Sequence, residues 1–141
     1  MATPERALQI AVKAHAGQQD KSGAAYIFHP LRVMARCRTD ESRIVALLHD
    51  VVEDTTVTFQ DLEAEGFSEP VLTALRLVTH RPDVPYDDYV RAIAQNPIAK
   101  EVKLADLEDN CDLRRLRQVD ERAVKRMQKY HRAFQILTGA A

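Results

Sequence analysis

Residues 46–55 read ALLHDVVEDT, and this stretch places two ionisable residues, His49 and Asp50, inside an apolar helical pattern. The pattern predicts a central, mostly buried helix. Glu53 and Asp54 follow at helical spacing, so we expect one helical face to carry all four side chains. Burying so many ionisable groups without partners would cost several kcal/mol, so this face either meets solvent or is compensated by a bound cation. A bound cation explains the four ionisable residues on this face more specifically than solvent exposure does.

Start and stop signals of helices recur along the chain, and the sequence contains no convincing alternating strand pattern. Thr3-Pro4 and Asn96-Pro97 each combine an N-cap residue with a proline in the first turn of a helix. Thr58 and Asp61 form a similar capping arrangement. We therefore predict an all-α fold with helices over residues 4–17, 30–34, 40–54, 58–66, 68–79, 85–95, 97–111 and 120–137.

The composition predicts one globular domain over residues 1–141. Hydrophobic residues make up 45% of the chain and charged residues 29%, as in globular proteins of this size. The net charge of −1 argues against a large basic surface for a nucleic-acid backbone. Residues 114–132 nevertheless contain eight Lys or Arg and two acidic residues. This basic segment is either a solvated helix face or a surface that attracts a phosphate-bearing ligand.

The sequence predicts a cytoplasmic protein that does not associate with membranes. No apolar run approaches the roughly 18 residues that a membrane-spanning helix requires. Residues 1–9 also lack the basic and apolar segments of a secretory signal. Cys37 and Cys111 lie in helical patterns without CxxC spacing, so we expect reduced, structural thiols.

Two further polar residues belong with the pair at positions 49 and 50. His29 precedes a proline, and Asp106 interrupts the buried pattern of residues 102–107, VKLADL. An isolated His-Asp pair is usually explained by a hydrogen-bonded buried histidine or a solvated helix end. Together, however, His29, His49, Asp50 and Asp106 form a mixed nitrogen and oxygen ligand set that suits Mn²⁺, with Fe²⁺, Zn²⁺ or Mg²⁺ as alternatives.

These residues, in this order, resemble the HD-domain phosphohydrolases. The closer resemblance is to the hydrolase half of Rel/SpoT enzymes and to the stand-alone small alarmone hydrolases. The motifs that carry it are Ala14-His15, Gly17-Gln18, Lys21-Ser22-Gly23, Tyr26-Ile27, His29-Pro30, residues 46–55, residues 102–106 and Asn110.

The resemblance implies an HD-type helical bundle and a hydrolytic reaction. It implies one Mn²⁺ on His29, His49, Asp50 and Asp106. The related enzymes remove pyrophosphate from the 3′ position of (p)ppGpp. In the corresponding roles here, Glu53 and Asp54 would orient and deprotonate a water molecule, and Lys21, Ser22 and Asn110 would hold the nucleotide. The implied partner is therefore a small phosphorylated molecule, in particular a nucleotide.

The chain departs from the family pattern where the relatives recognise the nucleotide. Asp20 occupies the position of an arginine that stacks on guanine, and we expect its charge to repel a polyphosphate. Cys111, Asp112 and Leu113 replace the basic and hydroxyl residues that often follow the asparagine. The metal and water machinery thus matches the family, whereas the recognition of guanine and phosphate is altered.

Two other functions are compatible with parts of the sequence. A non-catalytic module could bind a metal and sense a nucleotide without hydrolysing it. Nucleic-acid binding through the basic final helix is disfavoured by the balanced charge. Among the remaining polar residues, His15 is expected to be structural and His80 to lie in a surface loop. Lys103 is expected to pair with an acid or to contact phosphate, and the arginines near position 115 either hold a leaving pyrophosphate or lie at the surface.

Overall fold

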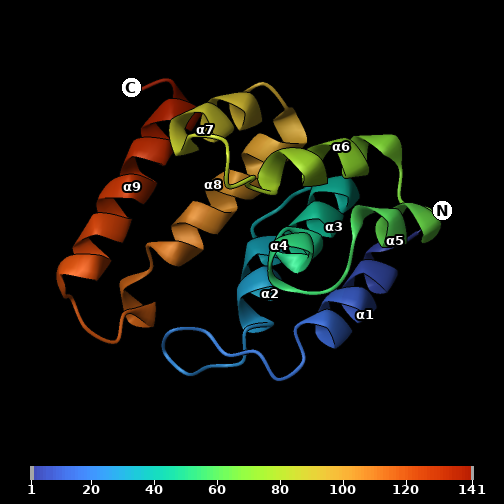
Figure 1. The fold of residues 1–141 in the computed structure, drawn as a ribbon, viewed down its shortest axis with the longest axis horizontal. Coiled ribbons are helices and arrows are strands. Elements are labelled where there is room, and N and C mark those ends of the chain that lie inside the picture. The colour runs from blue at the N-terminus through green and yellow to red at the C-terminus, as the bar shows by residue number, and fades with distance from the viewer. Residues whose placement is uncertain (1, 141) are drawn as a thin grey trace.

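The computed structural model describes residues 2–140, which form a helical bundle without β-strands (Figure 1). An isolated antiparallel bridge joins Gln19 to Ala25 in the loop after the first helix. The all-α prediction is therefore confirmed. The elements are α1 (Pro4–Ala14), α2 (Phe28–Ala35), α3 (Asp40–Leu48), α4 (Val51–Asp54), α5 (Phe59–Ala64), α6 (Glu69–Val78), α7 (Tyr86–Ala94), α8 (Pro97–Asn110), the 3₁₀ helix η1 (Leu113–Arg115) and α9 (Glu121–Thr138).

Side-chain caps start several of these helices at the predicted positions. The Thr3 hydroxyl accepts the Arg6 N–H at 3.2 Å, and the Asn96 side chain accepts the Ala99 N–H at 2.9 Å. Thr58 and Asp61 form the reciprocal bonds of a capping box. Each bond satisfies a backbone donor that the first turn leaves without a helical partner.

The predicted single helix over residues 40–54 is wrong, because the chain breaks at His49 and Asp50. α3 ends at Leu48, and α4 begins at Val51. Asp50 has φ −105° and ψ 0°, away from regular helical values. The break directs the two polar side chains toward the neighbouring helices α2 and α8 instead of along one helical face.

The second helix also starts earlier than predicted. α2 begins at Phe28, and Pro30 lies within its first turn, where the missing N–H of proline costs no hydrogen bond. His29 therefore belongs to the helix and does not precede it. The first helix ends earlier than predicted, at Ala14, with His15 as its C-cap.

α3 lies at the centre of the bundle and packs against α1, α2, α6 and α8. α9 packs on α7 and α8 at the other side of the molecule (Figure 1). The core consists mainly of aliphatic side chains, among them the fully buried Leu48, Leu75, Ile93 and Leu107. Because α2 and α8 flank the α3–α4 break, residues distant in sequence meet at one point.

None of the helices formed by residues 2–140 combines the length and the apolar character needed to cross a membrane.

Candidate functional site

The four predicted metal ligands meet where α2, the α3–α4 break and α8 come together. His29 Nε2 lies 2.9 Å from Asp106 Oδ1 and 3.7 Å from Asp50 Oδ2. His49 Nε2 lies 3.0 Å from Asp50 Oδ2 and 3.4 Å from Asp106 Oδ1. His29, His49 and Asp106 are buried, and Asp50 is partly exposed. The four side chains come from three segments: ligand atoms of His29, His49 and Asp50 lie within 4.8 Å of one another, and Asp106 contacts both rings.

The hydrogen bonds of the two rings leave their Nε2 atoms facing the carboxylates. His49 Nδ1 lies 2.6 Å from the Ala46 carbonyl oxygen, and His29 Nδ1 lies 2.6 Å from Asp109 Oδ2. Both neighbours are acceptors, so each Nδ1 carries a proton and donates it. The buried Nε2 of His49 has no hydrogen-bond partner, although Asp50 Oδ2 lies 3.0 Å away. Two ring lone pairs and two carboxylates are the donor set of a divalent cation, so these residues fit a metal ion.

The local electrostatics also favour a positive charge at this point. Burial alone would lower the pKa of His49, but Asp50 and Asp106 outweigh it and raise that pKa well above its ordinary value. Burial would raise the pKa of Asp106, but Lys103 and the two histidine rings lower it well below its usual range. Lys103 Nζ is 3.0 Å from Asp106 Oδ2, so it pairs with an acid, one of the two roles left open by the sequence.

The predicted acidic pair is divided between two environments. Glu53 lines a cavity of about 300 Å³ together with the four predicted ligands. Its carboxylate accepts the backbone N–H of His80, and burial, together with the charges of Asp50 and Asp54, raises its pKa. Asp54 lies outside that lining, although burial and the Asp50 charge raise its pKa as well.

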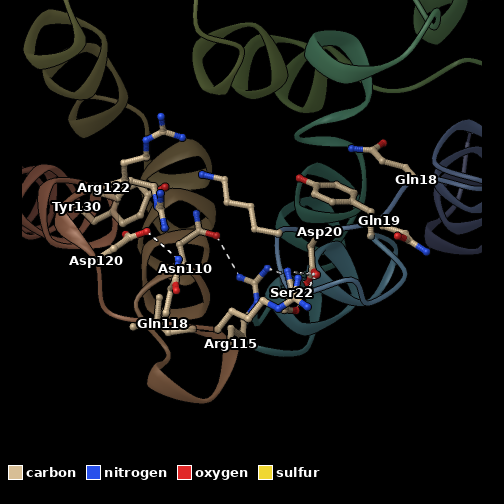
Figure 2. Close-up of a pocket in the computed structure, with 15 residues that line it drawn as sticks. Gln18, Gln19, Asp20, Ser22, Asn110, Arg115, Gln118, Asp120, Arg122 and Tyr130 are labelled. Carbon is tan, nitrogen blue, oxygen red and sulfur yellow. Dashed lines mark hydrogen bonds and ion pairs between the residues drawn. The ribbon is translucent and has the colours of Figure 1, made fainter.

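The predicted substrate residues line a second, larger cavity of about 760 Å³ (Figure 2). Lys21, Ser22 and Asn110 all belong to its wall. The Asn110 amide also donates to Asp106 Oδ1 at 3.1 Å, so it touches both cavities. The residues that line both cavities are Tyr26, Asn110, Arg115 and Tyr130. The two cavities therefore lie side by side.

Asp20 folds into its own loop. Its Oδ1 accepts the N–H and hydroxyl of Ser22 at 2.9 and 2.7 Å and the N–H of Ala24 at 3.0 Å. Its Oδ2 lies 3.5 Å from Arg115 Nη2 (Figure 2). Burial opposes ionisation, but these bonds and the Arg115 charge outweigh it and lower the pKa of Asp20. The carboxylate is thus paired with Arg115, and its repulsion of a polyphosphate stays a prediction.

Several cavity residues were not identified from the sequence. Tyr26 donates its hydroxyl proton to Asp50. His80 was expected in a surface loop, but it is half-buried and lines the smaller cavity together with Glu53 and the predicted ligands. Lys129 lines the same cavity, as do Tyr86 and Tyr89, for which the sequence left open helix packing and a place at the pocket mouth. Asp109, which lines neither cavity, was also not identified, although it follows Asp106 by three residues on the same helix and therefore shares a face with it.

Comparison with known proteins shows where the similarity lies. No protein-family model matches the chain. The guanosine-3′,5′-bis(diphosphate) 3′-pyrophosphohydrolase of Aquifex aeolicus (strain VF5) is 36% identical over 118 residues, which are 75% of this chain and 17% of that protein. The bifunctional (p)ppGpp synthase/hydrolase SpoT of Escherichia coli (strain K12) is 38% identical over 95 residues, 64% of this chain and 13% of that protein. The chain therefore spans less than a fifth of the length of these curated relatives.

A solved structure supports the same grouping at the level of the fold. It is described as a metazoan ortholog of SpoT that hydrolyzes ppGpp, and it matches with a TM-score of 0.77 and 28% identity. The match covers 97% of this chain and 86% of the solved chain. The resemblance drawn from the motifs is confirmed: over most of its length, this chain is similar in sequence and in fold to the HD-type hydrolases of the Rel/SpoT group.

Proposed function

We propose that the chain is a metal-dependent phosphohydrolase that removes pyrophosphate from a guanine nucleotide of the (p)ppGpp type. The observation that carries the proposal is the convergence of two imidazoles and two carboxylates beside a larger cavity rich in cationic side chains. A metal on one side and a polyanion on the other is the arrangement that phosphoryl chemistry requires. The printed names of the relatives point to the same reaction.

The resemblance to HD-type hydrolases implies a divalent metal ion, and we propose that His29, His49, Asp50 and Asp106 hold it. Mn²⁺ suits this mixed nitrogen and oxygen set best, with Fe²⁺, Zn²⁺ or Mg²⁺ as alternatives. When bound, such an ion lowers the pKa of a water molecule and neutralises charge on phosphoryl oxygens.

Glu53 is the proposed general base. The His80 N–H holds Oε1 of its carboxylate, which leaves Oε2 to take the proton from the attacking water. Its raised pKa brings the base closer to neutral pH, where proton transfer is more effective. Asp54 lies outside the wall of the smaller cavity and is proposed to share the proton transfer or to position the attacking water.

The larger cavity is the proposed binding place of the nucleotide. Burial and the nearby Arg126, Arg122 and Lys129 lower the pKa of Lys21, so several cations lie close together at this cavity. A polyphosphate would relieve that repulsion. Lys21 is proposed to contact phosphate directly. Ser22 and Asn110, already held by Asp20 and Asp106, are proposed to orient the nucleotide beside the metal.

The test is hydrolysis by the whole chain with Mn²⁺, first with ppGpp and pppGpp and then with ordinary nucleotides. We expect release of pyrophosphate from ppGpp, loss of activity in excess chelator and recovery with added Mn²⁺. Glu53→Gln should keep Mn²⁺ affinity and lower kcat by about 100-fold or more. Binding of metal and nucleotide without turnover of any phosphorylated compound would instead identify a sensing module.

The cytoplasmic location remains a prediction from the sequence.

A further inference from the structure

We propose that Asp109 is a positioning residue that holds the His29 ring with Nε2 facing the metal site, and that it thereby sets the affinity of that site. The inference rests on the proposed metal function. It concerns a carboxylate that lies behind the ligands and faces away from the substrate cavity. Asp109 lines neither of the two cavities and is fully buried.

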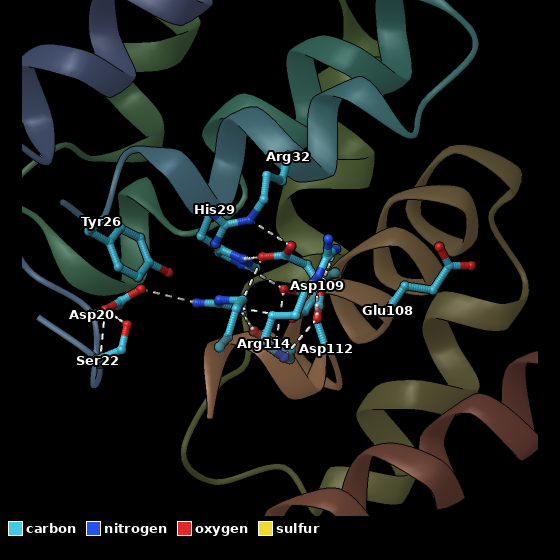
Figure 3. Close-up of polar contacts among 12 residues, drawn as sticks. Asp20, Ser22, Tyr26, His29, Arg32, Glu108, Asp109, Asp112 and Arg114 are labelled. Atoms are coloured by element: carbon cyan, nitrogen blue, oxygen red, sulfur yellow. Dashed lines mark hydrogen bonds and ion pairs between the residues drawn. The ribbon is translucent and has the colours of Figure 1, made fainter. Parts of the chain in front are cut away.

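The contact between the two side chains is short and closed to solvent. His29 Nδ1 lies 2.6 Å from Asp109 Oδ2, and the side chains are 3% and 0% exposed (Figure 3). A carboxylate in that position accepts the Nδ1 proton. The ring then presents the Nε2 lone pair, and this atom faces Asp50 and Asp106. Because an anionic acceptor raises the basicity of the imidazole, it strengthens a metal bond at the opposite nitrogen.

The two histidines differ in this respect. His49 donates its Nδ1 proton to a neutral acceptor, the Ala46 carbonyl oxygen one turn earlier in the same helix. That bond is local and follows from helix geometry. His29 instead depends on a residue 80 positions away in the sequence. Its orientation therefore depends on the packing of α2 against α8.

Arginines hold Asp109 in a single orientation. Arg32 Nε and Arg36 Nη1 lie 2.7 and 3.1 Å from Oδ1 (Figure 3 shows the Arg32 contact). Arg115 Nη1 lies 3.0 Å from Oδ2 and 3.1 Å from the Asp109 carbonyl oxygen. A buried carboxylate needs such partners to remain ionised. With Oδ1 occupied by two arginines, Oδ2 is the oxygen directed at the ring.

Asp109→Asn is the sharpest test, because the amide has the same shape and its oxygen can still accept from Arg32 and Arg36, although the contact of Oδ2 with Arg115 is lost. If its oxygen stays with Arg32 and Arg36, its NH₂ group faces His29 Nδ1. The ring would then need its proton on Nε2, which cannot ligate a metal in that form. We expect Mn²⁺ affinity, measured by calorimetry on the whole chain, to fall by about 10- to 100-fold. Asp112→Asn, the same change three residues later at a side chain that pairs with Arg114, should leave the affinity unchanged.

A second measurement on the unaltered chain covers the case in which Asp109→Asn does not fold. With diamagnetic Zn²⁺ as the probe, ¹⁵N spectra of the histidine rings should show His29 protonated at Nδ1 and ligated through Nε2. An unprotonated Nδ1, or equal Mn²⁺ affinity in a folded Asp109→Asn variant, overturns the inference while the proposed hydrolase stands. Absence of any Mn²⁺ binding by the unaltered chain overturns the proposed function as well.

Discussion

Arg115 Nη2 lies 3.5 Å from Asp20 Oδ2, so the loop residue that departs from the family pattern is paired with a cation of η1, the 3₁₀ helix that follows α8. The same guanidinium contacts the Asn110 side-chain oxygen at 3.2 Å and the Asp109 carboxylate at 3.0 Å. One arginine therefore connects the substrate loop, a predicted substrate residue and the carboxylate behind His29.

Replacement of Asp20 should lower the stability of its loop and, as a result, weaken nucleotide binding. Asp20→Arg removes three hydrogen bonds to residues 22 and 24 and sets two guanidinium groups against each other. We expect the free energy of unfolding to fall by about 1 to 3 kcal/mol and KM for ppGpp to rise. Urea denaturation and steady-state kinetics measure the two effects. Asp20→Asn keeps the accepting oxygen and is the matched control. Higher activity of the arginine variant would show that guanine stacking matters more than loop structure.

Lys103 should contribute to stability through Asp106. The Lys103 side chain is only 12% exposed, and its Nζ lies 3.0 Å from Asp106 Oδ2. Lys103→Met leaves a buried carboxylate without its cation, so we expect the metal-free chain to lose roughly 3 to 5 kcal/mol of unfolding free energy. Urea denaturation in chelator is the measurement. Lys125→Met, at an exposed position of α9, is the control. Unchanged stability with a raised KM would assign Lys103 to phosphate binding instead.

Arg126 should act on substrate affinity and leave the metal site intact. It lines the larger cavity and contributes to lowering the pKa of Lys21, which places the two cations near each other. Arg126→Gln should raise KM for ppGpp by about tenfold, the loss of one charge-assisted contact of roughly 1.5 kcal/mol, with normal Mn²⁺ affinity. Arg132→Gln, an exposed arginine of the same helix that pairs with Asp87, should leave KM unchanged. Equal effects of the two variants would indicate general electrostatic attraction.

Cys37 should be protected from thiol reagents by the fold. Its side chain is buried, and its Sγ donates to the Val33 carbonyl oxygen at 3.4 Å. Burial raises the pKa of the thiol to about 11, so the thiolate is scarce at pH 8. The folded state favours the neutral thiol, and this stabilisation is lost as pH rises above the pKa of the unfolded cysteine toward 11. At pH 8 we expect Cys37 to react with a disulfide reagent only when urea unfolds the chain, and Cys37→Ser should remove this urea-dependent labelling. Rapid labelling of Cys37 in the folded chain would contradict its burial.

The sequence was sufficient for most of the helices, and it identified candidate ligands whose role stays a prediction. Cap residues such as Thr3 and Asn96 act on the next few residues, so their effect can be read locally. His29, His49, Asp50 and Asp106 were identified by their motifs, and the structure brings them together. The break at His49 and Asp50 was missed because tertiary packing overrides a periodic apolar pattern.

Only the tertiary structure decided which partner each ionisable group has. Helical periodicity shows that Asp109 shares a face with Asp106, but not that His29 and three arginines surround it. The same holds for Asp20 with Arg115 and for His80 with Glu53. Hydrogen bonds and ion pairs depend on distances of about 3 Å, and for residues far apart in the chain those distances are set by how the helices pack. The sequence therefore determined which chemical groups are present and on which helices they lie, and the packing determined their contacts.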